Sequence, residues 1–214
     1  SPVTIGGTTP TLTIGDAGAE DTKIVFDGNA QDFHIGLDDS ADSLTIGLGS
    51  TLGTTSHMVF DANGHISKPL QSAFLAYAGN AQNNIAVGSD VPVIFDTEIF
   101  DQNADFNTSN YTFTAPVTGK YQLQTNVRIQ DAMTASLYYY LQLVTSNRAY
   151  LGYIINTAAF DQDLNYLTLN ITILADMDAN DTAFVKIVQH SGNQQTDIYN
   201  GTEYSTHFSG YLVA

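Results

Sequence analysis

Residues 119–129 read GKYQLQTNVRI. The odd-numbered side chains from Tyr121 to Ile129 are apolar or β-branched, and the even-numbered ones from Lys120 to Arg128 are polar or charged. A period of two is typical of a β-strand with one buried and one solvated face, because successive side chains of a strand point to opposite sides. The stretch therefore predicts a long, half-buried strand.

Further runs of this kind follow on both sides, separated by turn residues. They lie at Ser72–Tyr77, Pro92–Asp96, Tyr111–Ala115, Ser136–Val144, Ala149–Ile155, Leu164–Leu174, Ala183–His190 and His207–Val213. So many strands within residues 68–214, with Gly and Asn between them, indicate a β-sandwich or jelly roll. The fold class expected for the chain is all-β, with this jelly-roll head at its C-terminal end.

Residues 1–67 differ from the head because short phrases recur in them. The phrases are Val3–Gly6, Leu12–Gly15, Phe33–Gly36 and Leu44–Gly47, with a second type at Ile24–Gly28 and Met58–Asp61. Each is expected to form a short strand that buries little surface alone, and repeated small units usually stack on neighbours. We expect residues 1–67 to form a β stalk in which several chains intertwine.

Composition excludes several classes of function. The formal net charge is -16 with only 6 Lys and Arg residues, so no basic surface is available for a nucleic-acid backbone. The chain has no Cys, which removes disulfides, zinc–thiolate sites and a thiol nucleophile. No apolar run approaches the roughly 20 residues that span a bilayer, so no membrane insertion is expected. The opening residues are not a signal peptide, and we expect the chain to be part of a longer protein.

Catalytic and metal-binding patterns are weak. The run Asp176–Asp181 resembles the start of a calcium loop but lacks the expected Gly and the distal Glu, so a plain turn is favoured and calcium is the alternative. The 5 His residues form no metal-binding pair, and there is no Gly-x-Ser-x-Gly elbow. We therefore expect no metal, no cofactor and no enzymatic activity.

Two runs are read as apolar on both faces, Leu137–Leu141 and Leu167–Leu174. A strand of a monomeric sandwich should leave one face polar. The sequence thus predicts an oligomer, and we assign its interface to Tyr138, Tyr140, Leu167 and Leu169.

A set of spaced residues in the head, several of them aromatic, resembles the signature of the C1q and tumour-necrosis-factor family. These are Phe95, Asp101, Phe106 and Phe113, then Gly119–Leu123, with a closing Phe208–Leu212. Leu123 and Thr125 depart from it, because the family prefers aromatic residues there. The resemblance implies a ten-stranded jelly roll, a homotrimer of identical chains, and N- and C-termini together at the base of the head.

Residues 12–54 resemble repeats in tail-fibre and other structural proteins of marine bacteriophages, through phrases such as Leu12–Gly15 and Ile24–Gly28. This resemblance implies an elongated appendage on the surface of a virion. It brings no catalytic residues with it.

The working surface is expected in the loops at the far end of the head. Under the family topology these loops are about 130–134, 156–163 and 191–205. Their candidate receptor-binding residues are Asp131, Asp161, Asp163, Asp197, Tyr199, Glu203 and Tyr204. Tyrosine rings stack on sugar faces, while carboxylates and amides bond sugar hydroxyls, so a glycan suits these loops. The alternative is that these residues are solvated turn residues only.

The sequence favours a trimeric phage tail-fibre protein whose head binds a glycan or protein on the host cell surface. One alternative is a structural trimerisation or decoration domain without a receptor. Another is a tail-spike enzyme that degrades a glycan, for which the sequence offers no catalytic pair.

Overall fold

The computed structural model describes residues 2–201 and 203–214. The chain divides into two compact units, with the boundary between Gln71 and Ser72. Regular structure in the described residues is β-strand, apart from the short 3-10 helix η1 at Thr157–Ala159. No helix in that part of the chain has the length and apolar character needed to cross a membrane.

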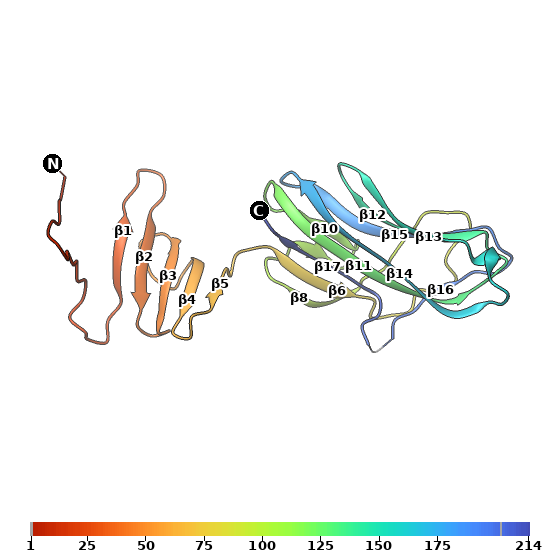
Figure 1. Cartoon of the computed structure of the whole chain (residues 1–214), viewed down its shortest axis with the longest axis horizontal. Coiled ribbons are helices and arrows are strands. Elements are labelled where there is room, and N and C mark those ends of the chain that lie inside the picture. The colour runs from red at the N-terminus through yellow and green to blue at the C-terminus, as the bar shows by residue number, and fades with distance from the viewer. Residues whose placement is uncertain (1, 202) are drawn as a thin grey trace. The chain divides into compact units, whose positions relative to one another are not determined.

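The N-terminal unit, residues 2–71, is built on one antiparallel sheet in which each strand pairs with the next along the chain (Figure 1). Its strands are β1 (Thr22–Phe26), β2 (Phe33–Asp38), β3 (Ser43–Leu48), β4 (Ser56–Asp61) and β5 (Ile66–Ser67). The expected strands are confirmed where the phrases fall in β1 to β4. They are wrong at Val3–Gly6 and Leu12–Gly15, which have no neighbouring strand in this chain to pair with.

One face of this sheet is covered by the chain itself. His34 and Thr45 are buried there, and the loop after β3 brings Leu52 over them. At Gly36 an added Cβ would lie 2.6 Å from the Thr22 carbonyl oxygen and 2.9 Å from Leu52 Cδ2. Gly36, which ends the repeated phrase Phe33–Gly36, is therefore needed because the neighbouring strand and the loop with Leu52 lie too close to it for a side chain to fit.

The head, residues 72–214, consists of two antiparallel sheets that pack face to face. The first sheet contains β14 (Leu164–Met177), β11 (Gly119–Ala132), β17 (His207–Leu212), β6 (Ala73–Tyr77) and β8 (Thr97–Asp101), with β16 (Asp197–Ile198) paired to β11. The second contains β13 (Ala149–Ile155), β12 (Tyr138–Thr145), β15 (Thr182–His190), β10 (Thr112–Thr114) and β9 (Phe106–Asn107), with β7 (Val91–Pro92) paired to β15. Each sheet has six strands when the two-residue strands are counted, and the chain crosses between the sheets after β11 and β14, as in a jelly roll.

The core of the head lies between the two sheets and is rich in aromatic rings. Phe74 is at its centre, with ring centroids 5.0 Å from Phe106, 4.9 Å from Phe113 and 5.0 Å from Phe208. The alternation predicted for residues 119–129 is confirmed, because Tyr121, Leu123, Thr125, Val127 and Ile129 are all buried. Such close packing of large side chains within one chain supplies most of the stability of a domain.

The head begins and ends at the same end of its sandwich. The backbone N–H of Leu212 donates to the carbonyl of Ser72 at 3.0 Å, and that of Lys120 donates to Ala214 at 2.6 Å. At Gly119 an added Cβ would lie 2.6 Å from the carbonyl oxygen of Ala214, which explains the glycine. The expectation that both termini meet at the base of the head is confirmed (Figure 1).

The interpretation of Leu167–Leu174 as apolar on both faces is wrong. Leu167 and Leu169 point into the core of the head, and Leu169 is only 1% exposed. The alternate positions on the outer face of β14 are polar, being Thr168, Asn170 and Thr172, and only Leu174 adds an apolar side chain. The period of two therefore continues through this strand, and Leu167 and Leu169 are core residues rather than interface residues.

Candidate functional site

Three loops come together at the end of the head opposite its termini. The hydroxyl of Ser136 donates to the carbonyl of Ser191 at 2.8 Å, and the hydroxyl of Thr157 donates to the carbonyl of Ser136 at 3.0 Å. The hydroxyl of Thr196 donates to the carbonyl of Asp131 at 2.9 Å. These bonds fix the loops around 130–136, 156–163 and 191–197 to one another.

Asp163 is tied into this loop cluster. Its Oδ1 accepts the backbone N–H of Thr134 at 2.6 Å and the hydroxyl of Thr134 at 2.8 Å. The two hydrogen bonds, led by the backbone N–H, hold the pKa of Asp163 below its ordinary value. Asp163 therefore carries a negative charge at the far end over the whole neutral range.

Asp131 and Asp161 are exposed in the same loop cluster. Asp131 has a φ of 58°, a left-handed backbone conformation that Asp and Asn tolerate better than most residues. Asp161 lies just after η1. The structure thus brings three of the expected carboxylate residues, Asp131, Asp161 and Asp163, to one end.

Asp197 has a structural role as well. Its Oδ1 accepts the backbone N–H of Asn84 at 2.6 Å, and the next residue, Ile198, exchanges backbone hydrogen bonds with Gln82. The side chain therefore anchors the segment between β6 and β7 to the head. This role agrees with the alternative interpretation, in which Asp197 stabilises a turn and does not bind a receptor.

Tyr199 belongs to a cluster on the outer face of the first sheet. The guanidinium of Arg128 lies 4.2 Å from the ring centroid of Tyr166 and 5.0 Å from that of Tyr199. The two rings meet edge to face at 5.3 Å. Stacking of this kind holds a cation in place while its N–H groups can still donate to a ligand.

Sequence reasoning did not include Arg128 or Tyr166 in the site. Arg128 sits in the polar half of the alternation in β11, where it reads as an ordinary solvated residue. Only the pairing of β11 with β14, which sets Arg128 opposite Thr168 and Gln130 opposite Tyr166, brings the two side chains together. Register of this kind is not readable from either strand alone.

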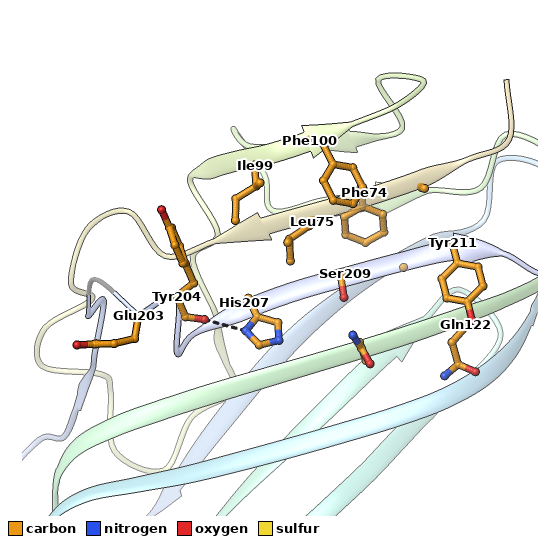
Figure 2. A pocket seen from close by; sticks show the side chains of 13 residues that line it. Phe74, Leu75, Ile99, Phe100, Gln122, Glu203, Tyr204, His207, Ser209 and Tyr211 are labelled. Carbon is orange, nitrogen blue, oxygen red and sulfur yellow. Dashed lines mark hydrogen bonds between the residues drawn. The ribbon is translucent and has the colours of Figure 1, made fainter. Parts of the chain in front are cut away.

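Glu203 and Tyr204 lie away from the far-end loops, which corrects their expected position. They border a groove of about 600 Å³ on the outer face of β8, β6, β17 and β11 (Figure 2). β16 and β17 pair with β11 in the same direction, with Ile198 opposite Ile129 and His207 opposite Asn126, so the loop between them leaves the sheet partway along β11. The loop before β17 is therefore carried onto the face of the sheet rather than to its end.

The groove is lined mainly by apolar side chains, with a few polar ones among them. Ile99, Phe100, Tyr204 and Tyr211 are about half exposed along it, and Gln122, Gln124 and Ser209 also line it. His207 Nδ1 lies 2.8 Å from the carbonyl oxygen of Tyr204 (Figure 2). The ring of Tyr204 also meets that of Tyr77 edge to face at 4.8 Å. So much exposed apolar area in one groove is typical of a surface that binds a partner.

A second apolar surface covers the outer face of β12 and β13. Tyr138 stacks on His190 with ring centroids 4.3 Å apart, and Tyr140 pairs across the sheet with Ile154. Leu151 and Ile154 are about half exposed, and Tyr153 is 70% exposed. Tyr138 and Tyr140 thus lie on the surface, as an interface role requires, whereas the buried Leu169 does not.

The run Asp176–Asp181 covers the end of β14 and the turn that follows it. Asp176 accepts from the guanidinium of Arg148 at 2.9 Å, and Asp181 Oδ2 accepts from the amide of Asn147 at 3.0 Å and from the backbone N–H of Asp178 at 2.8 Å. Its oxygens therefore face donors of the protein. No group of three or more His, Cys, Asp or Glu side chains suited to a metal ion occurs in the described residues.

Comparison with known proteins matches residues 73–213 to the C1q domain. The chain belongs to the C1q domain family. Its head is similar in fold to the globular domain of zebrafish complement 1qA protein, with 16% sequence identity, a TM-score of 0.47, and coverage of 67% of this chain and 98% of that chain. No curated protein matches the sequence.

Two further solved structures are similar to the C1q domain. Murine APRIL at pH 8.0 shares 14% identity with a TM-score of 0.47, covering 67% of this chain and 99% of that chain. Eiger TNF from S. frugiperda shares 8% identity with a TM-score of 0.47, covering 67% of this chain and 92% of that chain.

Proposed function

We propose that the chain is the distal part of a trimeric bacteriophage tail fibre or similar virion appendage, and that its C1q domain binds a glycan on the host cell surface. The observation that carries the proposal is the cluster of three loops at the far end of the head, fixed to one another by hydrogen bonds. Loops held on a rigid β scaffold are where binding residues are most often found.

The trimer is supported by two apolar surfaces at opposite edges of the head. The groove lies over β8 and β6, at one edge of the first sheet. The second apolar surface, on β12 and β13 and called the β13 surface below, lies beside β14, at the other edge. A contact between unlike surfaces of neighbouring copies leads to a ring when the rotation closes. Three copies, with the β13 surface of each in the groove of the next, agree with the trimer that the family resemblance implies.

Glycan binding is supported by the chemistry of the far-end residues. Asp131, Asp161 and Asp163 offer acceptors for sugar hydroxyls, and Arg128 offers several donors beside two tyrosine rings. Single-site contacts of this kind are weak. Three sites on one particle raise the overall affinity through avidity, provided that the receptor is repeated on the host surface.

The test is binding of the purified trimer to host cells and its competition with virion adsorption. We expect the double substitution Asp131→Asn with Asp161→Asn to weaken binding about tenfold or more, since bonds to charged groups contribute roughly 1.5–3 kcal/mol each. Glu98→Gln, an exposed carboxylate on β8, is the matched control and should bind normally. Failure of the unmodified trimer to bind cells or to compete would contradict the proposal.

A structural role without a receptor is the second candidate. It is favoured if the chain forms a stable trimer that never binds host cells and if antibodies to the head leave adsorption unchanged. The enzyme alternative is tested separately by incubating the trimer with host polysaccharide. Shortening of the polysaccharide chains would support it.

A further inference from the structure

One face of the N-terminal sheet carries nearly all of its large apolar side chains; we call it the apolar face. Strand register places Ile24, Ile35, Ile46 and Met58 in one row across β1 to β4. The rows on either side contain Leu37, Leu44 and Phe60, and Phe26, Phe33 and Leu48. The strands thus present three adjoining apolar rows on one side of the sheet.

The arrangement is the reverse of that expected for a monomer. The covered face holds small or polar residues such as His34, Gly36 and Thr45, while six large residues of the apolar face, all on β1 to β3, remain between 37% exposed (Ile35) and 55% exposed (Phe26). A sheet with one solvated face normally turns its polar side to water. The loop of the N-terminal unit therefore covers the more polar face of the sheet and leaves the apolar face exposed.

The uncovered area is large enough for an interface. At these exposed fractions the apolar face leaves on the order of 600 Å² of apolar surface open to water, close to the roughly 800 Å² that each partner contributes to a standard interface. None of the strand positions on this face is charged. Lys23, Asp38 and Asp61 fall on the opposite side of their strands, because they alternate with apolar-face residues.

We propose that the apolar face packs against the same face of two further copies of this chain, forming a closed apolar core in the stalk. This inference rests on the trimer of the proposed function. A net charge of -16 makes most surfaces of two copies repel each other, and the apolar face is the side on which they can approach without facing carboxylates. A trimeric head would also hold three such faces at an effective concentration of roughly millimolar.

The packing differs from strand exchange. Each copy already completes its own antiparallel sheet from β1 to β5, so no strand of a neighbour is needed to fill a gap. What each copy lacks is a second layer over its apolar face. Domains are built from two packed layers around one core, and neighbouring copies supply the missing layer here.

The experiment uses single cysteines in the full chain, which has no natural Cys. Ile35→Cys lies at the centre of the apolar face, and Lys23→Cys, on the opposite face of β1, is the matched control. We expect mild oxidation to join copies of I35C but not of K23C. We also expect the thiol of I35C to react with maleimide at least tenfold more slowly than that of K23C.

Several outcomes separate this inference from the trimer itself. If the chain sediments as a trimer but I35C neither cross-links nor is protected, the apolar face is not the interface and the inference alone fails. If the thiol is protected without cross-linking, another occupant covers the face, such as residues 2–21 of the same chain, and the inference also fails. A monomeric chain overturns both the inference and the proposed trimer. Leu44→Cys gives a second site in a neighbouring row if I35C does not fold, as judged by circular dichroism.

Discussion

Both units of this chain are built from antiparallel strands that have one strongly apolar face. The head buries this face, whereas the N-terminal unit buries the other one. In the head, Phe74, Phe113 and Phe208 are fully enclosed between two sheets of one chain. In the N-terminal unit, Phe26 and Phe33 remain about half exposed, and His34 is fully buried. The difference shows that a period of two specifies a strand and its two faces, but not which face the chain itself will cover.

The largest expected effect is on the stability of the head, and it compares removal of a core ring, Phe74, with removal of a ring on the apolar face, Phe33. Phe74→Ala removes the centre of the aromatic core and should lower the free energy of unfolding of the head by about 3–5 kcal/mol. Phe33→Ala should leave the unfolding transition of the head within about 0.5 kcal/mol of the parent. Urea unfolding followed by near-ultraviolet circular dichroism measures both. Equal destabilisation of the head by the two variants would remove the distinction between the units.

A second prediction concerns the close contact at Gly36. Gly36→Ala places a Cβ against the Thr22 carbonyl and Leu52, so it should push the loop away from the covered face at a cost of about 1–3 kcal/mol. Limited proteolysis should then cut residues 49–55 faster. Gly6→Ala, where an added Cβ meets nothing within 4 Å, is the control. Unchanged cleavage in the Gly36 variant would mean that the loop does not rest on this face.

The third prediction is a pH effect confined to the head. The pKa of Asp163 is held below 3.8 by the two hydrogen bonds from Thr134, so these bonds persist above that pH and are lost as the pH falls through the lowered pKa. The amide proton resonance of Thr134 should therefore titrate with a midpoint below 3.8. Asp163→Asn should abolish this titration. A midpoint at or above 3.8 would show that the loop is not tied down in this way.

The smallest effect is expected at the base of the head. Arg148 and Asp176 form an ion pair at 2.9 Å, but both side chains are largely solvated. Exposed pairs contribute about 0–1 kcal/mol and are screened by salt. Arg148→Met should change the free energy of unfolding by less than about 1 kcal/mol, with the difference shrinking in 1 M salt. A loss above 2 kcal/mol would indicate a wider network at this turn.

Much of the head follows from its sequence. The buried side chains of β11 follow directly from the alternation between Tyr121 and Ile129, and the all-β class follows from many similar runs. Strand β8 was not expected, because its apolar residues Ile99 and Phe100 are adjacent and exposed, which hides the period. The polar outer face of Leu167–Leu174 is hard to recognise in the sequence, because Thr168, Asn170 and Thr172 alternate with large apolar residues and Leu174 ends the row.

The candidate site is predictable only in part. Loops 130–134 and 156–163 do meet at the far end, since each joins a strand of one sheet to a strand of the other at that end of the sandwich. The position of Glu203 and Tyr204 depends on where the loop between β16 and β17 leaves the sheet, and that point is set by the pairing of both strands with β11. The Arg128 cluster depends likewise on register between β11 and β14. Both features depend on pairing between strands that are distant in the sequence, and the local sequence pattern does not predict that pairing.

The most direct measurement of the difference between the two units is hydrogen exchange on the full chain over a dilution series, with the sedimentation coefficient recorded at each concentration. As the trimer dissociates, we predict that amides of β2 and β3 lose protection while those of β11 and β14 keep it. The head is enclosed by its own two sheets, whereas the N-terminal sheet depends on neighbouring copies. Protection of β2 and β3 that stays constant while the trimer falls apart would contradict this.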